Sequence, residues 1–570
     1  SFYVSYIISV LVCALPCTLL ELTVGQYTGL GPIRSCRSVA PVFTGLGIAN
    51  VMTSAFCSVY WNMTHAWLIY YLYNSFFTPL PWLTCTNAWN THDCFSIKND
   101  EECRAINQTF FYGGCQTMET FCASRLVNGH RFAAVPGETR SCQNLTSSSL
   151  VSLSVLRGNT THPPAERSLL QDAFVDGTDA SLTRLGDLSF PVLICNSVAW
   201  AMTFFYIVLV KNASNKAYVA TWLTATTMFK ALLMSVLVLR AVTLPNAGAG
   251  LAVFGTDWVR HLMDPNLWFD SMTHTIYCSG VGFGGLFSLA TRNDFHHAFV
   301  WDSIGLCFMN AVVSTLMSLA FYAYVGEMWK NADGADGNTI TSVTVNKVIK
   351  YGFGLIFSTY PEAMAVTPVP NLWSILLFSM LTFNTLDSES GMVKVVVLAV
   401  EEAWPVCVGR RFWVTLCICV SGFLLSLPLC FQGGIYLIIL MIDFSAVSPL
   451  LLVCLLNVLG FIFVYGREKL LGHFEEMVKP GVWVKRYLKI TWLYSVPVIL
   501  SVSHPLIFER LAQICTFVSF VFLAQPAAVI LMDSPLTTNV LGWSYVLVHI
   551  LPIPFAALVE IWRSFRKNEV

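Results

Sequence analysis

The sequence predicts an all-α polytopic membrane protein, and three observations support this fold class. Of its 570 residues, 55% are hydrophobic and only 11% are charged, which is too apolar for a soluble globular chain. Apolar stretches of helical spanning length recur along the chain. A single long polar segment, rich in cysteine, interrupts them. The net charge of -1, without a basic stripe, argues against nucleic-acid binding.

A membrane core about 30 Å thick requires about 20 apolar residues in a helix. Stretches of this kind lie near residues 3 to 24, 41 to 75, 187 to 210, 217 to 243, 270 to 290, 299 to 325, 372 to 399, 411 to 430, 435 to 466, 487 to 505, 511 to 532 and 541 to 562. Between 487 and 532 we expect only one full crossing. Two crossings there would put the basic end of the chain outside, against the distribution of positive charge.

The connecting segments indicate the orientation. Arg and Lys residues mark alternate short loops as cytoplasmic, beginning with Arg34 and Arg37. We therefore divide the chain into 1–77, with two transmembrane helices; 78–186, an extracellular loop; and 187–570, with the remaining helices and a cytoplasmic C-terminus.

Two features of the 78–186 segment agree with an extracellular, oxidising location. It contains glycosylation sequons at Asn107, Asn144 and Asn159. It also contains six cysteines, which allow fifteen pairings. The short spacing in CTNAWNTHDC favours a disulfide between Cys85 and Cys94.

Six fragments, in order along nearly the whole chain, resemble the sodium- and chloride-dependent neurotransmitter transporter family. They are LLELTVGQYTGLGPI, LPWLTCTNAWNTHDC, LVLRAVTLPNA, VGFGGLFSLATRNDF, STYPEAM and LDSESG. The resemblance implies a LeuT-like fold with two inverted repeats. Residues 3 to 28 resemble the family's second helix, so we expect about 11 transmembrane helices here, with the family's first helix absent from this chain.

The resemblance also explains four glycines in the apolar run YCSGVGFGG, which begins at Tyr277. Residues Cys278 to Gly284 match an unwound stretch in the family's sixth helix. Transporters of this type expose backbone groups to ions and substrate where a helix is broken near the membrane midplane. The alternative is a face of small residues for close helix packing.

Sodium prefers oxygen ligands, and an aspartate inside a span marks a functional site by default. By resemblance, Asp387 and Ser388 match two sodium ligands, Asn384 contributes a backbone carbonyl, and Asn310 matches a ligand of the other site. An interhelical hydrogen bond is the alternative for Asn310. At that second site Cys278 would serve only through its carbonyl, because a neutral thiol is a poor ligand for a hard cation.

The family's chloride site aligns with Tyr6, His274, Cys278 and Ser314. Two of the four residues differ from the family pattern. Histidine can donate a hydrogen bond to an anion, whereas a thiol is a weak donor. The sequence therefore does not decide whether chloride binds as a second ion.

The substrate pocket also departs from the family pattern, since Trp61 follows Tyr60 where paired tyrosines are usual, and Glu389 replaces a smaller residue. Glu389 could recognise a cationic substrate group or pair with Lys230 or Lys394. The residues expected to contact substrate are Tyr60, Trp61, Tyr277, Ser279, Gly280, Phe283, Ser388 and Glu389.

No nucleophile elbow, phosphate loop or HExxH motif suggests an enzyme. The sequence predicts a plasma-membrane symporter that couples sodium to a small amino acid or amino-acid-derived solute, by alternating access around a central site. The alternative is a transport-inactive or truncated family member that acts as a binding or regulatory membrane protein.

Overall fold

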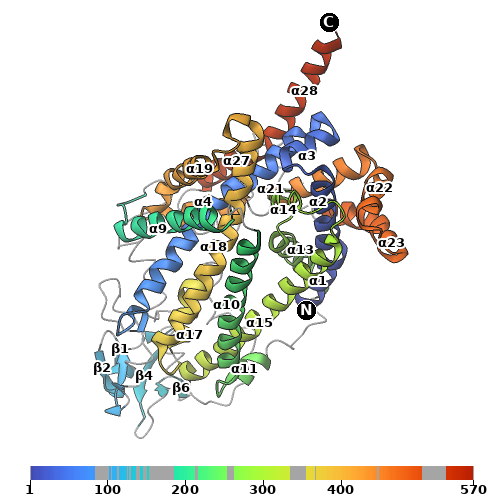
Figure 1. Ribbon diagram of the computed structural model, residues 1–570. Coiled ribbons are helices and arrows are strands. Elements are labelled where there is room, and N and C mark those ends of the chain that lie inside the picture. The colour runs from blue at the N-terminus through green and yellow to red at the C-terminus, as the bar shows by residue number, and fades with distance from the viewer. Residues whose placement is uncertain are drawn as a thin grey trace.

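The fold is described from a computed structural model, in which helices dominate (Figure 1). The description covers residues 2–83, 102–152, 185–211, 216–252, 262–333, 355–365, 367–445, 448–502 and 535–568. Within 102–152 it leaves out 104, 112–113, 125, 128–129, 136–140 and 146–149. The expected pair Cys85 and Cys94 and the sequon at Asn159 lie outside the described residues.

Seven helical segments among the described residues are long and apolar enough to cross a membrane. An eighth is possible if a pair bent by 93° is one span. The seven are Phe2–Thr28, Pro41–Asn74, Phe190–Val210, Ala217–Val242, Phe299–Met328, Arg411–Cys430 and Val540–Arg566. They coincide with seven of the stretches expected from the sequence.

The other expected spans are broken, more polar, or partly outside the description. The stretch near 270 to 290 forms two helices, and α18 (Pro370–Ala403) is 34 residues long but contains polar and acidic residues. The stretch near 511 to 532 is outside the described residues. The chain is therefore a multi-pass helical membrane protein, consistent with the predicted fold class.

The N-terminal half begins with a continuous helix formed by α1 (Phe2–Ser9), η1 (Val10–Ala14) and α2 (Leu15–Thr28). After it come α3 (Pro32–Val39), η2 (Pro41–Phe43), α4 (Thr44–Asn74), η3 (Pro81–Leu83), α9 (Phe190–Tyr206), η5 (Ile207–Lys211), α10 (Lys216–Val242), α11 (Ala247–Ala252), α13 (Pro265–Ser279), α14 (Gly285–Ala290) and α15 (Phe299–Asp333).

The C-terminal half contains the long helix α18 and a series of shorter ones. In order they are η7 (Leu355–Thr359), α17 (Tyr360–Ala365), α18, η8 (Pro405–Cys407), α19 (Arg411–Ser426), η9 (Leu427–Cys430), α20 (Gly434–Ser445), α21 (Ser448–Leu459), η10 (Gly460–Val464), α22 (Arg467–Val478), α23 (Val482–Ile490), η11 (Thr491–Ser495), α24 (Val496–Val502), α27 (Pro535–Ile550) and α28 (Pro552–Asn568).

Helices α4 and α18 pack along each other through the middle of the molecule (Figure 1). Tyr71 of α4 is fully buried there, stacked on Trp82 at 5.4 Å between ring centroids and 5.2 Å from Phe378 of α18. Its hydroxyl donates a hydrogen bond to the carbonyl of Phe357 at 2.8 Å. This aromatic cluster fixes the register of the two helices at one end, and aromatic pairs add to the free energy gained by burial.

The described part of the 78–186 segment forms two small antiparallel sheets at the end of the molecule far from the C-terminus (Figure 1). The strands are β1 (Thr109–Phe111), β2 (Gly114–Gln116), β3 (Leu126–Val127), β4 (His130–Ala134), β5 (Ser141–Asn144) and β6 (Leu150–Ser152), with helix α6 (Met118–Ser124). Disulfides join Cys103 to Cys115 and Cys122 to Cys142, with Cα atoms 5.3 and 5.8 Å apart.

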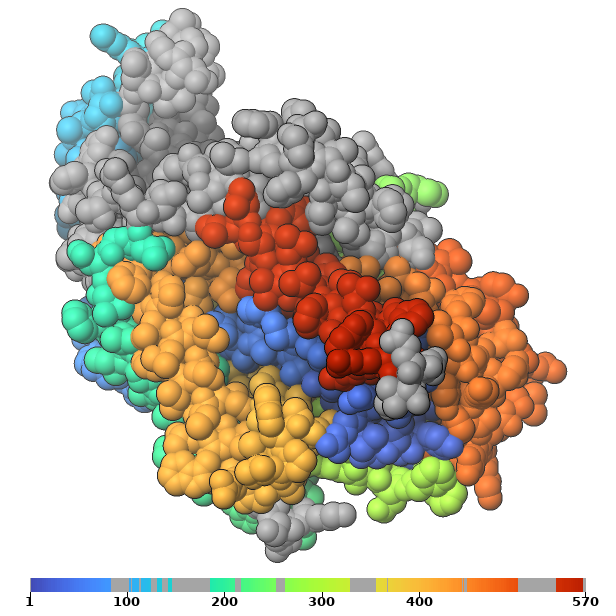
Figure 2. Space-filling model, turned by 90° about the horizontal axis from the view of Figure 1, so that it is seen from above, coloured from blue at the N-terminus to red at the C-terminus, as the bar shows by residue number. Residues whose placement is uncertain are grey.

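The C-terminal helix α28 lies against the N-terminal segment, as the adjacent red and blue atoms in Figure 2 show. Glu560 accepts a hydrogen bond from the guanidinium of Arg37 at 3.3 Å. A Cβ atom on Gly45 would lie 2.3 Å from the carbonyl oxygen of Pro552, so the two backbones meet closely because position 45 has no side chain.

Candidate functional site

The helix near the middle of the chain is broken at its glycines. Helix α13 ends at Ser279, and α14 begins at Gly285. Between them Gly280, Gly282 and Gly284 adopt positive φ angles of 73°, 82° and 74°, a conformation that side chains with a Cβ rarely adopt. The unwound stretch therefore lies at residues 280 to 284, and Cys278 and Ser279, which were expected within it, still belong to α13.

Polar side chains from three other helices hold the unwound backbone. The N–H of Gly282 donates a hydrogen bond to Oε1 of Glu21 at 2.9 Å. The same oxygen accepts a hydrogen bond from Nδ2 of Asn457 at 3.3 Å. The hydroxyl of Ser54 donates to the carbonyl of Phe283 at 2.6 Å. Backbone groups that leave a helix inside a membrane need such partners, so these side chains make the break possible.

Sequence reasoning missed Glu21, Ser54 and Asn457 as site residues. A signal for Glu21 was present, because it is an acidic residue within an apolar stretch and its side chain is only 1% exposed. No comparable signal marks Ser54 or Asn457, since hydroxyl and amide side chains are common in packed transmembrane helices.

The structure brings together the residues expected at one sodium site. Nδ2 of Asn310, on α15, donates a hydrogen bond to the backbone carbonyl of Cys278 at 3.0 Å. The two groups therefore meet at the end of α13, two residues before the break. A carbonyl oxygen and an amide side chain are ligand types that a hard cation prefers. The hydrogen bond that joins them is the interhelical contact considered as the alternative for Asn310.

The residues expected at the other sodium site are arranged differently. The carboxylate of Asp387 accepts a hydrogen bond from the hydroxyl of Tyr206 at 2.5 Å and forms an ion pair with the ammonium of Lys230. The hydroxyl of Ser388 donates to the backbone carbonyl of Asn384 at 3.3 Å. The Asp387 carboxylate and the Asn384 carbonyl thus already accept hydrogen bonds from the protein, and the Ser388 hydroxyl is the donor to Asn384.

The four residues aligned with a chloride site lie near one another. The rings of Tyr6 and His274 are 5.6 Å apart between centroids, and Nε2 of His274 is 3.6 Å from Sγ of Cys278. The hydroxyl of Tyr3, one turn earlier on α1, donates a hydrogen bond to the backbone carbonyl of Ser314 at 3.4 Å. Hydroxyl, imidazole and thiol groups from α1, α13 and α15 therefore lie near one another, with Tyr6 buried and His274 and Cys278 exposed.

Aromatic residues expected to contact substrate surround the break. The hydroxyls of Tyr60 and Tyr277 are 3.2 Å apart. The ring of Tyr277 packs edge-to-face with Phe283 at 5.5 Å and lies 6.4 Å from Trp61. A Cβ atom on Gly280 would meet no atom within 4 Å, so there is open space beside the break.

Three further residues expected to contact substrate differ in their exposure and hydrogen bonding. The hydroxyl of Ser279 donates to the carbonyl of Ile276 of its own helix at 2.9 Å. Ser388 is on the exposed surface of α18. Glu389 is fully buried, and neither of its carboxylate oxygens has a hydrogen-bond partner among the described residues.

The expected glycosylation sites differ in exposure. Asn107 is exposed in a turn, whereas Asn144 is 9% exposed in strand β5, where it lies opposite Phe132 of β4. An N-linked glycan requires an accessible side chain, so the two positions differ as acceptors.

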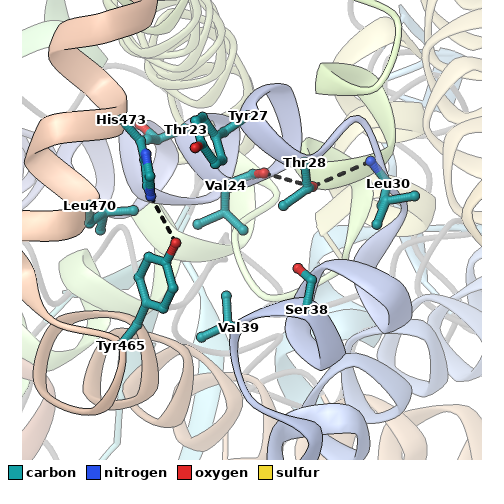
Figure 3. A pocket seen from close by; sticks show the side chains of 10 residues that line it. All are labelled: Thr23, Val24, Tyr27, Thr28, Leu30, Ser38, Val39, Tyr465, Leu470 and His473. Carbon is teal, nitrogen blue, oxygen red and sulfur yellow. Dashed lines mark hydrogen bonds between the residues drawn. The ribbon is translucent and has the colours of Figure 1, made fainter.

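A separate cavity of about 240 Å³ lies where the end of α2 meets α3, η10 and α22 (Figure 3). The ring of His473 stacks on Tyr27 at 3.7 Å, and its Nε2 is 2.8 Å from the hydroxyl of Tyr465. None of the residues that line this cavity belongs to the sets expected to bind ions or substrate. The cavity is therefore distinct from the broken helix.

Comparison with known proteins adds independent evidence. The family model described as the Sodium:neurotransmitter symporter family matches residues 1–162 and 138–564. The chain is 29% identical, over 503 residues, to a "Sodium- and chloride-dependent GABA transporter ine" of Drosophila melanogaster, covering 88% of this chain and 46% of that protein. It is 27% identical, over 507 residues, to "Sodium- and chloride-dependent GABA transporter 2" of Rattus norvegicus, covering 88% of this chain and 72% of that protein.

Proposed function

Because the chain belongs to the sodium:neurotransmitter symporter family, whose members are transporters and not enzymes, we propose that it is a sodium-coupled symporter for a small amino acid or amino-acid-derived solute. The proposal places it in the plasma membrane, with access to a central site alternating between the two sides. The chain spans less than half of the Drosophila relative. The activity of that whole protein is therefore assigned to this chain only as part of the proposal.

The observation that carries the proposal is the broken helix with its surroundings. There is open space beside Gly280, and the hydroxyls of Tyr60 on α4 and Tyr277 on α13 lie 3.2 Å apart. These hydroxyls can hydrogen-bond a carboxylate or an amine, and the packed rings around them exclude water. Paired hydroxyls of this kind suit the polar ends of a small zwitterion better than a large apolar ligand.

Glu389 and Trp61 support a substrate with a polar or cationic end. Both carboxylate oxygens of Glu389 and the indole Nε1 of Trp61 are buried without a hydrogen-bond partner among the described residues. Buried polar atoms without partners are costly, and a ligand that satisfies them recovers that cost. An amino group near Glu389 would do so, and the ring of Tyr277 lies 6.4 Å from that of Trp61.

Sodium would bind where Asn310 meets the carbonyl of Cys278. Chloride would bind at the cluster of Tyr6, His274, Cys278 and Ser314, where the Tyr6 hydroxyl is the strongest donor. The ions would supply charge that the apolar interior lacks, and they would link solute entry to the sodium gradient.

Uptake into proteoliposomes tests the proposal. The purified chain is reconstituted, and uptake of radiolabelled GABA and of a panel of small amino acids is measured with an inward sodium gradient or with choline in its place. We expect at least one solute to accumulate with sodium and not with choline. No sodium-stimulated uptake of any solute would favour a binding or regulatory role instead.

A matched pair of variants on α4 links uptake to the broken helix. Tyr60→Phe removes the hydroxyl that meets Tyr277, and the loss of one hydrogen bond to substrate raises KM by about 2- to 10-fold. Tyr73→Phe changes an exposed residue near the end of the same helix and leaves KM unchanged. Equal effects of the two variants on KM would show that the Tyr60 hydroxyl does not bind the transported solute.

A further inference from the structure

Asp387 lies where three membrane helices meet, and two of them provide its partners. Tyr206 is the last residue of α9, and Lys230 lies in the middle of α10. Helices α10 and α18 pack together at this level, where Phe229 and Phe383 make an edge-to-face contact at 5.5 Å. The Lys230 side chain is therefore held beside Asp387 by helix packing and not by chance contact at a mobile surface.

Both oxygens of the Asp387 carboxylate are engaged by donors. Oδ1 accepts from the Tyr206 hydroxyl at 2.5 Å, and Oδ2 pairs with the Lys230 ammonium. The side chains of Lys230 and Asp387 are 17% and 23% exposed, respectively. A lysine within a span is costly unless an opposite charge compensates it, and Asp387 provides that compensation.

This arrangement does not fit a sodium ion. A sodium ion at Asp387 needs an oxygen lone pair directed at it, and the neighbouring ammonium repels a second cation. The other two expected ligands bond to each other, because the backbone carbonyl of Asn384 accepts a hydrogen bond from the hydroxyl of Ser388. The pairing also differs from the one considered from the sequence, in which Lys230 was a possible partner of Glu389.

We propose that the Lys230 ammonium takes the place of a sodium ion at Asp387, so that the chain binds sodium exchangeably only at the Asn310 site. The positive charge at Asp387 is then covalently tethered, and its binding costs no loss of a free ion's translational freedom. Sodium binding at Asn310 rests on the function proposed above, whereas the pairing of Lys230 with Asp387 does not.

Sodium binding to the purified chain tests the inference without measuring transport. The probe is ²²Na⁺ alone, and stoichiometry and affinity are measured for wild type, Lys230→Met, Lys230→Arg and the double variant Lys230→Met with Asp387→Asn. Lys394→Met, which changes another lysine two turns further along α18, is the matched control.

Lys230→Met leaves the Asp387 carboxylate without its cation, so we expect this variant to bind one more sodium ion per chain than wild type. The affinity of Lys230→Met for sodium at that added site should be at least about tenfold higher than that of Lys230→Arg. Sodium should also raise the thermal stability of Lys230→Met more than that of wild type. The double variant and Lys394→Met should match wild type in stoichiometry.

Two results would overturn the inference. One is a folded Lys230→Met variant with no additional sodium ion. The other is a double variant that binds one sodium ion fewer than wild type, because Asp387 would then hold sodium in the native chain. The second comparison remains decisive if Lys230→Met does not fold. A wild type without sodium binding, together with a gain in Lys230→Met, would refute the proposed sodium coupling and support the lysine inference.

Discussion

The glycines of the broken helix provide a graded test of the structure, because alanine meets a different obstacle at each of three positions. Gly282 has a φ angle of 82°, and an added Cβ would lie 2.7 Å from Sγ of Cys454 and 2.8 Å from Cδ1 of Leu450. Gly280 has a φ angle of 73° but open space for a Cβ. Gly285 has neither a positive φ angle nor a contact closer than 4.0 Å.

These geometries give a predicted order of stability. A left-handed conformation costs an alanine about 1–2 kcal/mol, so Gly280→Ala should destabilise the chain by about that amount. Gly282→Ala adds the crowding against Cys454 and Leu450, which costs about 1–3 kcal/mol more. Gly285→Ala should be neutral or stabilise by up to about 1 kcal/mol, because alanine loses less backbone freedom than glycine on folding.

Apparent melting temperatures of the purified variants, measured under identical conditions by loss of the monodisperse size-exclusion peak, provide the comparison. The expected order from most to least stable is Gly285→Ala, Gly280→Ala, Gly282→Ala, with wild type close to the first. Equal melting temperatures for the three variants, or a Gly285→Ala variant less stable than Gly282→Ala, would refute the assigned break.

Two further predictions concern other parts of the chain. Glu21→Leu removes the acceptor for the Gly282 N–H and should destabilise by about 1–3 kcal/mol, whereas Glu21→Gln keeps an accepting oxygen and should lower the melting temperature less. Equal losses for the two variants would contradict this role for the carboxylate. In the outer segment, Asn107→Gln should increase gel mobility by removing a glycan, while Asn144→Gln should not, because Asn144 is only 9% exposed. A shift for Asn144→Gln alone would contradict the placement of β5.

Much of the fold could be predicted from the sequence because its signals are local. The length and apolar character of a stretch report on one helix at a time, and seven predicted stretches coincide with long apolar helices. The helix break was also predicted from its glycines, but it begins two residues later than expected. Residues Cys278 and Ser279 remain helical because Gly280 is the first position whose backbone takes the left-handed conformation.

The sequence by itself determined the membrane class, the approximate spans and the position of the broken helix. Only the tertiary structure decided which polar groups inside the membrane meet. Glu21 accepts a hydrogen bond from the N–H of Gly282, which is 261 residues away in the chain. Lys230 pairs with Asp387, 157 residues away, and not with Glu389. One position along α18 turns a side chain by about 100°, so helix rotation and packing selected the partner of Lys230.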